Sequence, residues 1–534
     1  MKADVPALTS PPAALDHGLG AAVAAGDWSA AAGIMERWGV ELQAGVHRGH
    51  FFDAVTHTPD SLCAAHPGIV YWREAGRVTE IPVERPSFDA ARLAAGGEAG
   101  LIELRRVAAA VLARRRRGFV AEAVAILDEM MPAVRTAIRR QGDLPITDAA
   151  WFLMQAGITF DVFGDVHTAR RYYLMAWQRR DDDVVGLGSQ DLPAKLAVLA
   201  AIDGDHAEVG RWVAVAGRTP TTDPAELDGT DLGYPLAEFI VAVDRLDFTT
   251  SDELLPYIAL PTEYEEFFHY LVWARAHRLL VMGRIGEVLR LIDETAVAWD
   301  DLVAGDGWYR THLTALRAKA LLAGGRVDEA EATLESLSNS DDGIVLLWAR
   351  AGALRLHFDA AMEHLVGISD RPPRRVQLEA QLLAAACHLN LGQISLARSK
   401  FQAFVASVGH NLQSMASISE THLHGLFALL GSVPAANALE ARWQEFRHLR
   451  TYPYPETSIS VSDRELVVLR RLARGESRAE IAKAEFVSAN TVKTQVTALY
   501  RKFNATNRSE LIAKALSHGL LAGSRNAVTE HLSD

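Results

Sequence analysis

A short structural unit recurs along most of this 534-residue chain. In each instance an apolar helix ends at or near a glycine, a turn follows, and an alanine-rich helix begins. Most successive units lie one or two intervals of about 35–45 residues apart, a period typical of helix-turn-helix solenoids. Because one helix pair cannot bury its apolar stripe alone, such pairs must stack. The turns are marked by Gly26, Gly118, Gly164, Gly204, Gly283, Gly325 and Gly392, and a further unit begins at His357-Phe358-Asp359.

This pattern predicts an all-α fold with a helical solenoid over residues 15–450. The unit from Ala318 to Leu337 looks like a tetratricopeptide repeat, and an irregular all-helical domain is the alternative. Residues 1–14 are predicted to be a flexible amino terminus. Pro453 and Pro455 forbid a continuous helix, so residues 451–459 are predicted to be a linker.

The charge of the chain is divided unevenly. The whole sequence has a net charge of −13, which by itself argues against a nucleic-acid binder. Residues 458–523, however, carry +5, and the 457 residues before them carry −17. The acidic total therefore hides a small basic segment. The uneven division of charge suggests that the acidic region could hold or repel that segment.

Capping chemistry predicts four helices within residues 460–522, followed by a flexible tail over 523–534. Ser462 and Ser477 each precede a glutamate by three residues, which is the spacing of a capping box. Ser488 begins a third helix, and Asn507 opens a fourth.

The predicted third helix, residues 489–503, has two different faces. Val492, Val496, Leu499 and Phe503 form an apolar stripe at helical spacing. A predicted short helix over 478–484 and a four-residue turn precede it, which is helix-turn-helix geometry. On the face opposite the stripe, asparagine, lysine, threonine and arginine side chains can read base edges in a major groove. The face opposite the stripe carries Asn490, Lys493, Thr494, Thr497 and Arg501.

The same segment resembles the LuxR-type (FixJ/NarL-like) DNA-binding domain. The resemblance rests on Val461 to Leu469, Ala473 to Ala482, Val487 to Val496, and the tail from Tyr500 to Leu521. It implies that Lys493, Thr494 and Thr497 read bases, and the residue chemistry adds Asn490. It also implies dimerisation through the fourth helix, about 509–518. The implied phosphate contacts are Arg464, Arg478, Arg501, Lys502 and Arg508.

Three positions depart from the family pattern. Arg478 replaces an asparagine, Gln495 a histidine, and Glu485 a leucine that is normally buried beside the turn. A buried unpaired carboxylate is costly, so we expect Glu485 to tilt outward or to be paired.

The opening of the chain, from Leu15 to Pro67, is similar to the repeat region of the large ATP-dependent LuxR regulators. No Gly-x-x-x-x-Gly-Lys-Ser/Thr motif occurs, so we expect their ATPase module to be missing, and we expect no receiver domain before the repeats. The sequence also lacks the common hydrolase, metalloprotease and dinucleotide motifs. We therefore predict no enzyme activity, catalytic residue, cofactor or metal site.

Three smaller features have ordinary structural interpretations. His422-Leu423-His424 is either half of a metal site or a pair of surface or packing histidines, the latter being favoured. The run Arg114–Arg117 is either an anion patch or, preferably, a solvated helix end. Cys63 and Cys387 are expected to be small core residues.

Together these features predict a bacterial, cytoplasmic, sequence-specific transcription regulator without a membrane segment. Its predicted partners are double-stranded DNA, a second copy of the chain, and an unknown protein, peptide or small-molecule effector at the repeat domain. RNA polymerase is a further candidate partner. The alternative is a protein-interaction scaffold whose helix-turn-helix serves as a docking module. Glu485 and Gln495, which depart from the family pattern, support this alternative.

Overall fold

The computed structural model shows an all-α protein, and the residues that the structure describes contain no strand. These residues are 12–44, 48–63, 66, 69, 72–73, 87–139, 146–179, 191–216, 232–260, 267–304, 308–338, 341–431, 433–446, 449, 452, 461–503, 505–517 and 521.

The first half of the chain contains helices α1 (Pro12–Ala24), α2 (Trp28–Ala44), α3 (Arg48–His57), α4 (Asp60–Cys63), α6 (Ala90–Ala95), α7 (Gly97–Arg116), α8 (Val120–Arg139), α9 (Ile146–Val162), α10 (Val166–Trp177), α11 (Asp191–Asp203), α12 (His206–Ala216), α13 (Gly233–Asp244) and α14 (Phe248–Leu254), with the 3-10 helix η2 (Leu255–Ile258). The second half contains α15 (Phe268–Val281), α16 (Ile285–Ala298), α17 (Asp300–Ala304), α18 (Trp308–Ala323), α19 (Val327–Leu334), α20 (Asp342–Leu354), α21 (Phe358–Val366), α22 (Arg374–Asn390), α23 (Ile394–Ser407), η3 (Leu412–Ser417), α24 (Glu420–Leu429), α25 (Pro434–Gln444), α26 (Asp463–Ala473), α27 (Arg478–Ala484), α28 (Ala489–Lys502) and α29 (Arg508–Ser517).

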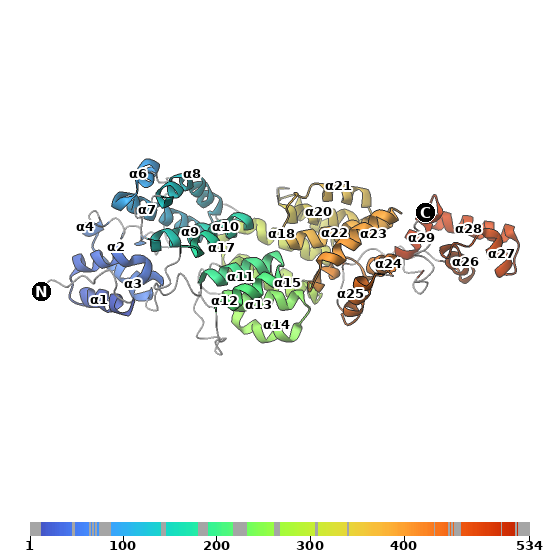
Figure 1. The fold of residues 1–534 in the computed structure, drawn as a ribbon, viewed down its shortest axis with the longest axis horizontal. Coiled ribbons are helices and arrows are strands. Elements are labelled where there is room, and N and C mark those ends of the chain that lie inside the picture. The colour runs from blue at the N-terminus through green and yellow to red at the C-terminus, as the bar shows by residue number, and fades with distance from the viewer. Residues whose placement is uncertain are drawn as a thin grey trace.

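Consecutive helices pack as hairpins, and the hairpins follow one another along an elongated molecule (Figure 1). Helix α11 contacts both its partner α12 and the next hairpin at α13, and α20 contacts α21 and α22 in the same way. This serial packing is the arrangement that the recurring unit predicted. The likeness of the units to tetratricopeptide repeats remains a prediction. We refer to α1–α25 as the array.

The predicted turn glycines lie at the hairpin turns. All seven have positive φ, between 67° and 90°, a region that costs other residues free energy because of their Cβ atoms. Leu356, just before the predicted unit at His357, adopts the same conformation with φ 63°. Leu246, with φ 62°, makes an equivalent turn between α13 and α14 that the glycine pattern did not predict.

The interpretation of Arg114–Arg117 as a solvated helix end was wrong for its first two residues. Arg115 is fully buried at the end of α7 and donates hydrogen bonds to the Gln155 carbonyl and side chain and to Thr159 on α9. Arg114 is also buried and pairs with Glu122 at 3.1 Å. These arginines join neighbouring helices, because the next hairpin packs against the helix end.

Several smaller expectations can be compared directly with the structure. Cys387 is fully buried, as expected, and the side chain of Cys63 lies outside the described residues. The ring nitrogens of His422 lie 2.7 Å from Asn390 Nδ2 and 2.7 Å from Ser419 Oγ, which is a packing role. Among the described residues no cluster of metal-ligating side chains occurs, and none of their helices is long and apolar enough to cross a membrane.

The ends of the predicted domains are only partly described. Helix α1 begins at Pro12, so the array starts earlier than the predicted boundary at residue 15. Within the predicted linker, 451–459, the structure describes only Tyr452, which is buried. The tail, 523–534, lies outside the described residues.

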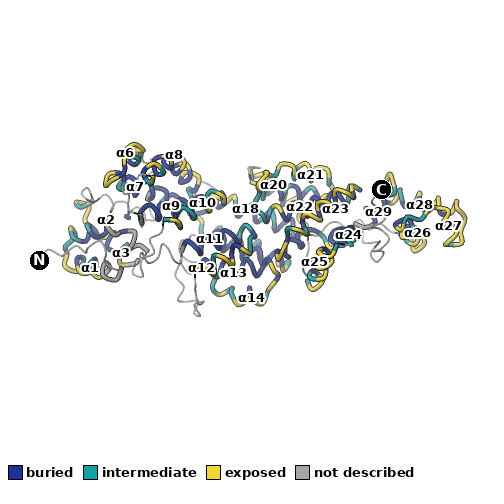
Figure 2. The backbone as a smooth tube through the Cα atoms, viewed as in Figure 1, coloured by how far each residue is buried: buried dark blue, intermediate teal, exposed yellow. Residues whose placement is uncertain are grey.

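The carboxyl-terminal helices are not separate from the array. Helix α29 packs against α22 and α24, and it lies between the array and α26–α28 in Figure 1. A single buried apolar core runs from the middle of the array into these helices, as the blue interior in Figure 2 illustrates. The predicted fourth helix therefore serves as the contact between the two parts of the chain.

Candidate nucleic-acid interface

Helices α26–α29 form the predicted four-helix domain, and local capping fixes where they begin. Ser462 and Ser477 each form a complete capping box with Glu465 and Glu480, and Ser488 Oγ accepts from the Thr491 amide at 3.0 Å. The fourth cap differs in detail from the prediction. Asn507 Oδ1 accepts from the Glu510 amide at 2.8 Å, whereas the Glu510 carboxylate accepts from the Thr506 amide at 2.7 Å.

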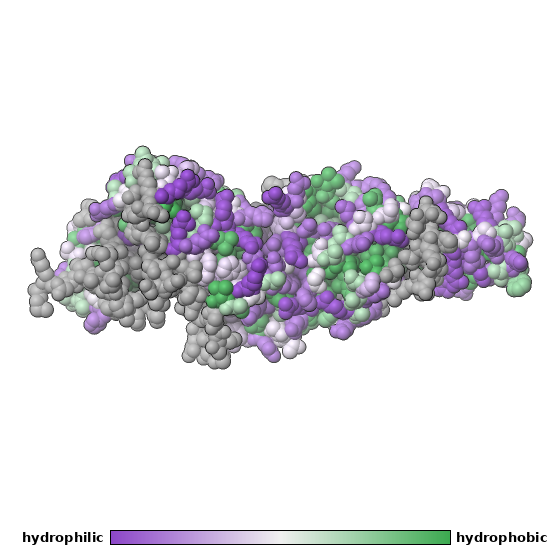
Figure 3. Space-filling model, viewed as in Figure 1, coloured by the Kyte–Doolittle hydropathy of each residue, from purple (hydrophilic) through white to green (hydrophobic). Residues whose placement is uncertain are grey.

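Helix α28 has the two faces that the sequence predicted. Val492, Val496 and Leu499 are buried against α26 and α27, and Phe503 is buried at the end of the helix. All five residues of the opposite face are exposed, and Figure 3 shows that hydrophilic residues predominate over this end of the molecule. The exposed residues are Asn490, Lys493, Thr494, Thr497 and Arg501.

The two threonines of this face use their hydroxyl groups within the helix. Thr494 Oγ1 donates to the Asn490 carbonyl at 3.0 Å, and Thr497 Oγ1 donates to the Lys493 carbonyl at 2.9 Å. With the hydroxyl groups satisfied, the methyl groups are suited to apolar contact with a base.

The predicted phosphate contacts fall into two groups. Arg464, Arg478 and Arg501 are exposed, and none of them forms an ion pair within the described part of the chain. Lys502 Nζ lies 2.7 Å from the Glu465 carboxylate, and Lys502 is the main cause that lowers the Glu465 pKa. Arg508 donates to the carbonyls of Leu472 and Glu476, and so closes the end of α26. Lys502 and Arg508 thus already hold the domain together.

Glu485 is paired, as expected from its position beside the turn. Its Oε1 lies 2.5 Å from Arg471 Nε, and its side chain is 31% exposed. The same arginine lies 3.0 Å from Glu476. One guanidinium therefore holds two carboxylates, and the departure from the leucine of the family pattern leaves no unpaired buried charge.

Phe486 is a feature of the turn whose importance the sequence argument missed. Its φ is 54° and its side chain is 96% exposed, so the ring projects from the turn between α27 and α28. An aromatic residue at the centre of a helix-turn-helix turn is the signal that could have identified it. Val487, beside it, is also exposed.

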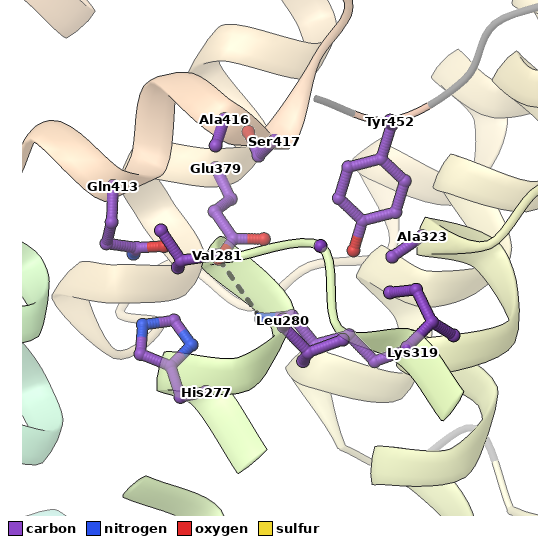
Figure 4. A pocket seen from close by; sticks show the side chains of 12 residues that line it. His277, Leu280, Val281, Lys319, Ala323, Glu379, Gln413, Ala416, Ser417 and Tyr452 are labelled. Atoms are coloured by element: carbon purple, nitrogen blue, oxygen red, sulfur yellow. Dashed lines mark hydrogen bonds and ion pairs between the residues drawn. The ribbon is translucent and has the colours of Figure 1, made fainter. Parts of the chain in front are cut away.

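A set of residues outside this domain also escaped the sequence argument. His277, Lys319, Glu379 and Tyr452 line a hollow in the array (Figure 4). They come from α15, α18, α22 and the linker, and only Tyr452 stood out locally, as an aromatic residue beside the linker prolines.

Comparison with known proteins agrees with this geometry. Residues 460–515 match the family described as bacterial regulatory proteins, luxR family. The transcription regulator of virulence factors BvgA from Bordetella pertussis is 49% identical over 65 residues, which are 12% of this chain and 31% of BvgA. The transcriptional regulatory protein YdfI from Bacillus subtilis is 31% identical over 104 residues, 19% of this chain and 48% of YdfI.

The chain thus spans less than half the length of these curated relatives. The match supports a helix-turn-helix domain of the luxR family at the carboxyl-terminal end of this chain.

Proposed function

We propose that this protein is a sequence-specific, DNA-binding transcription regulator that inserts α28 into the major groove. The observation that carries the proposal is the exposed face of α28, which bears Lys493 and Arg501 and has no acidic residue from Ala489 to Lys502. The luxR-family match over the same domain supports this assignment.

Individual residues have distinct roles in this proposal. Asn490, Lys493, Thr494 and Thr497 read base edges, and Arg464, Arg478 and Arg501 contact phosphates. Lys502 and Arg508 are secondary phosphate contacts, because their side chains already bind Glu465 and the end of α26.

The helical array controls the DNA-binding domain in this proposal. Helix α29 is the helix that we predict to form the homodimer, yet it packs against α22 and α24. Dimerisation and docking would then compete for one helix. An effector that loosens the array contact would release α29, allow dimerisation, and raise DNA affinity.

A scaffold function has one specific observation in its favour. The exposed ring of Phe486 is an apolar group that a partner protein could cover. RNA polymerase is one candidate for this partner. A contact between RNA polymerase and this protein bound to DNA would combine the scaffold function with the DNA-binding function.

The test is DNA binding by the full chain. Fragments selected from genomic DNA should share a sequence, and affinity for that sequence should fall steeply with salt, with a log–log slope of about −0.9 per phosphate contact. Genome-wide mapping should give discrete sites. Salt-insensitive binding, or selection without a shared sequence, would leave the scaffold function as the better account.

A further inference from the structure

One arginine of α26 contacts both ends of α27, the first helix of the helix-turn-helix. Arg471 donates from Nε to Glu485 Oε1 at 2.5 Å and from Nη1 to Glu476 Oε2 at 3.0 Å. Glu476 lies in the turn just before α27, whereas Glu485 ends α27 and begins the turn to α28. Arg471 therefore joins the two turns that flank α27. We call Arg471, Glu476 and Glu485 the clamp.

Glu476 gives the clamp a fixed end. Its amide donates to the Arg471 carbonyl at 3.3 Å, and its own carbonyl accepts from Arg508 of α29 at 3.3 Å. The Arg508 guanidinium also donates to the Leu472 carbonyl at the end of α26. The backbone of Glu476 is thus held from both α26 and α29. The contact from Arg471 to Glu485 ties the other end of α27 to this fixed point.

The turn that begins at Glu485 has few other side-chain anchors. Phe486 and Val487 are exposed, and Phe486 has a positive φ of 54°. The Ser488 hydroxyl group is directed to α28, where it accepts from the Thr491 amide at 3.0 Å. Among residues 485–488, all of which the structure describes, Glu485 is the one whose side chain is hydrogen-bonded to α26.

The clamp is better suited to fixing an orientation than to adding stability. Its three side chains are 24–31% exposed, so water screens their charges and each ion pair adds little to the free energy of unfolding. The planar guanidinium, however, presents its N–H groups in a fixed fork. Two carboxylates bound to that fork are therefore held in one geometry relative to each other.

The position of this turn sets where α28 begins. Asn490 and Lys493, two of the proposed base-reading residues, lie within the first two turns of α28. Hydrogen bonds to base edges require a precise helix position, whereas a long arginine side chain can follow a phosphate when the helix shifts. A loosened turn should therefore reduce the discrimination between sequences more than it reduces the overall DNA affinity.

We propose that Arg471 is a positioning residue for DNA reading, which fixes the turn before α28 through Glu485 and does not itself contact DNA. The effect on DNA reading rests on the proposed function. The effect on the turn can be measured without DNA.

The first experiment measures hydrogen exchange over residues 485–492 in the free full chain. Amides in this segment are held by hydrogen bonds, such as that from Val487 to the Ala482 carbonyl at 3.0 Å. Exchange should be several-fold faster in Arg471→Gln than in the wild type. The control Arg470→Gln removes an exposed arginine from the same helix and should match the wild type. Equal exchange in the two variants would overturn the proposal.

The second experiment measures the affinity of each variant for the selected sequence and for random DNA. In Arg471→Gln the ratio of the two affinities should fall about tenfold, the loss expected when one base contact is misplaced. Arg470→Gln should leave the ratio unchanged, because loss of a cation outside the base contacts weakens both affinities alike. An equal loss on both duplexes in Arg471→Gln would make Arg471 a phosphate contact and contradict the positioning role.

Glu485→Gln separates positioning from charge, and it tests the proposal even if Arg471→Gln does not fold. Removal of a negative charge should raise the affinity for random DNA, because less charge repels the phosphates. Positioning predicts that the affinity ratio falls nevertheless. The double variant Arg471→Gln/Glu485→Gln should lose no more discrimination than Arg471→Gln, because both changes break one contact. An unchanged ratio in Glu485→Gln, or losses that add in the double variant, would overturn the proposal.

The results distinguish a failure of the positioning role from a failure of the proposed function. Faster exchange in Arg471→Gln, in a chain that prefers no DNA sequence, would refute the proposed function and support the hold of Arg471 on the turn. A wild-type chain that prefers one sequence, with exchange and affinity ratio both unchanged in Arg471→Gln, would refute only the positioning role.

Discussion

At the scale of single residues, Lys493 is the sharpest probe of DNA reading. Its side chain is exposed on α28 and makes no ion pair with another described residue. If it contacts a base edge, Lys493→Ala should cost about 1–3 kcal/mol of binding free energy at the selected sequence and much less on random DNA. Fluorescence anisotropy on both duplexes measures this difference.

The control for this prediction removes an equal charge from the array. Lys400→Ala, on the exposed side of α23, should change both affinities little. An equal loss on both duplexes for Lys493→Ala would identify Lys493 as a phosphate contact and contradict the base-reading assignment.

Glu485 illustrates what residue identity alone can predict. The need to pair or expose this carboxylate followed from the cost of burying a charge. Its partner, Arg471, lies on the preceding helix and also pairs with Glu476. Nothing in the residue types singles out Arg471 among the several arginines of α26, because the choice depends on how α26 and α27 cross.

At the scale of elements, the hairpin turns differ in how tightly they are enclosed. A Cβ atom at Gly118 would lie 2.1 Å from the Leu302 carbonyl oxygen, whereas at Gly164 it would meet nothing within 4 Å. Both glycines have positive φ. We predict that Gly164→Ala costs about 1 kcal/mol of unfolding free energy, from the backbone conformation alone.

Gly118→Ala adds a clash with backbone and should cost about 3 kcal/mol or more. Urea denaturation of the two variants measures the contrast. Similar losses would mean that α17 can move away from the turn between α7 and α8, contrary to the packing described above.

Helix α15 should make the stability of the array sensitive to mild acid. Burial lowers the pKa of His277 to about 4 and the pKa of His269 well below its usual range. Because the unfolded chain binds these protons more readily, stability is complete above about pH 6.5 and declines as pH falls toward 4. Each such histidine contributes a slope of about 1.4 kcal/mol per pH unit within this window.

We therefore expect His277→Gln to flatten the fall in melting temperature between pH 7 and pH 5. The control variant is His57→Gln, which replaces a histidine that is 66% exposed. Glu379, which contacts Lys319 beside His277, does not explain a loss between pH 7 and pH 5. Burial raises the pKa of Glu379, but Lys319 and Arg350 outweigh that effect and hold it at about 2. An unchanged slope in His277→Gln would contradict the assignment.

At the scale of the whole molecule, the docking of α29 on the array is the contact most open to test. Gly392, in the turn between α22 and α23, faces the fourth helix. A Cβ atom there would lie 3.0 Å from Glu510 Cγ and 3.2 Å from Glu510 Cα. Asparagine tolerates positive φ, so Gly392→Asn should preserve the turn while crowding α29.

If docking restrains the DNA-binding domain, Gly392→Asn should raise DNA affinity several-fold, because a larger fraction of molecules is competent to bind. Gly164→Asn makes the same substitution in an open turn and should have no effect on affinity. Unchanged or weaker binding by Gly392→Asn, with helical content intact by circular dichroism, would argue against control through this contact.

The acidic array and the basic carboxyl-terminal domain are not held together by their opposite charges at α28. The acidic array does not cover the basic face of α28 by ion pairing, since Lys493 and Arg501 make no ion pair with any described residue. Contact occurs instead through α29, whose Leu511 and Ala515 are buried in the shared core. The array thus holds the domain through an apolar contact, which should depend little on salt.

By itself, the sequence determined the features that depend on a few neighbouring residues. Caps at Ser462, Ser477 and Ser488, positive φ at the turn glycines, and the apolar stripe of α28 all arise within one or two helical turns. Only the tertiary structure decided the burial of Arg115, the placement of Tyr452 over Arg350, and the docking of α29. Each of these joins segments far apart in the chain, so its energy depends on how the helices stack.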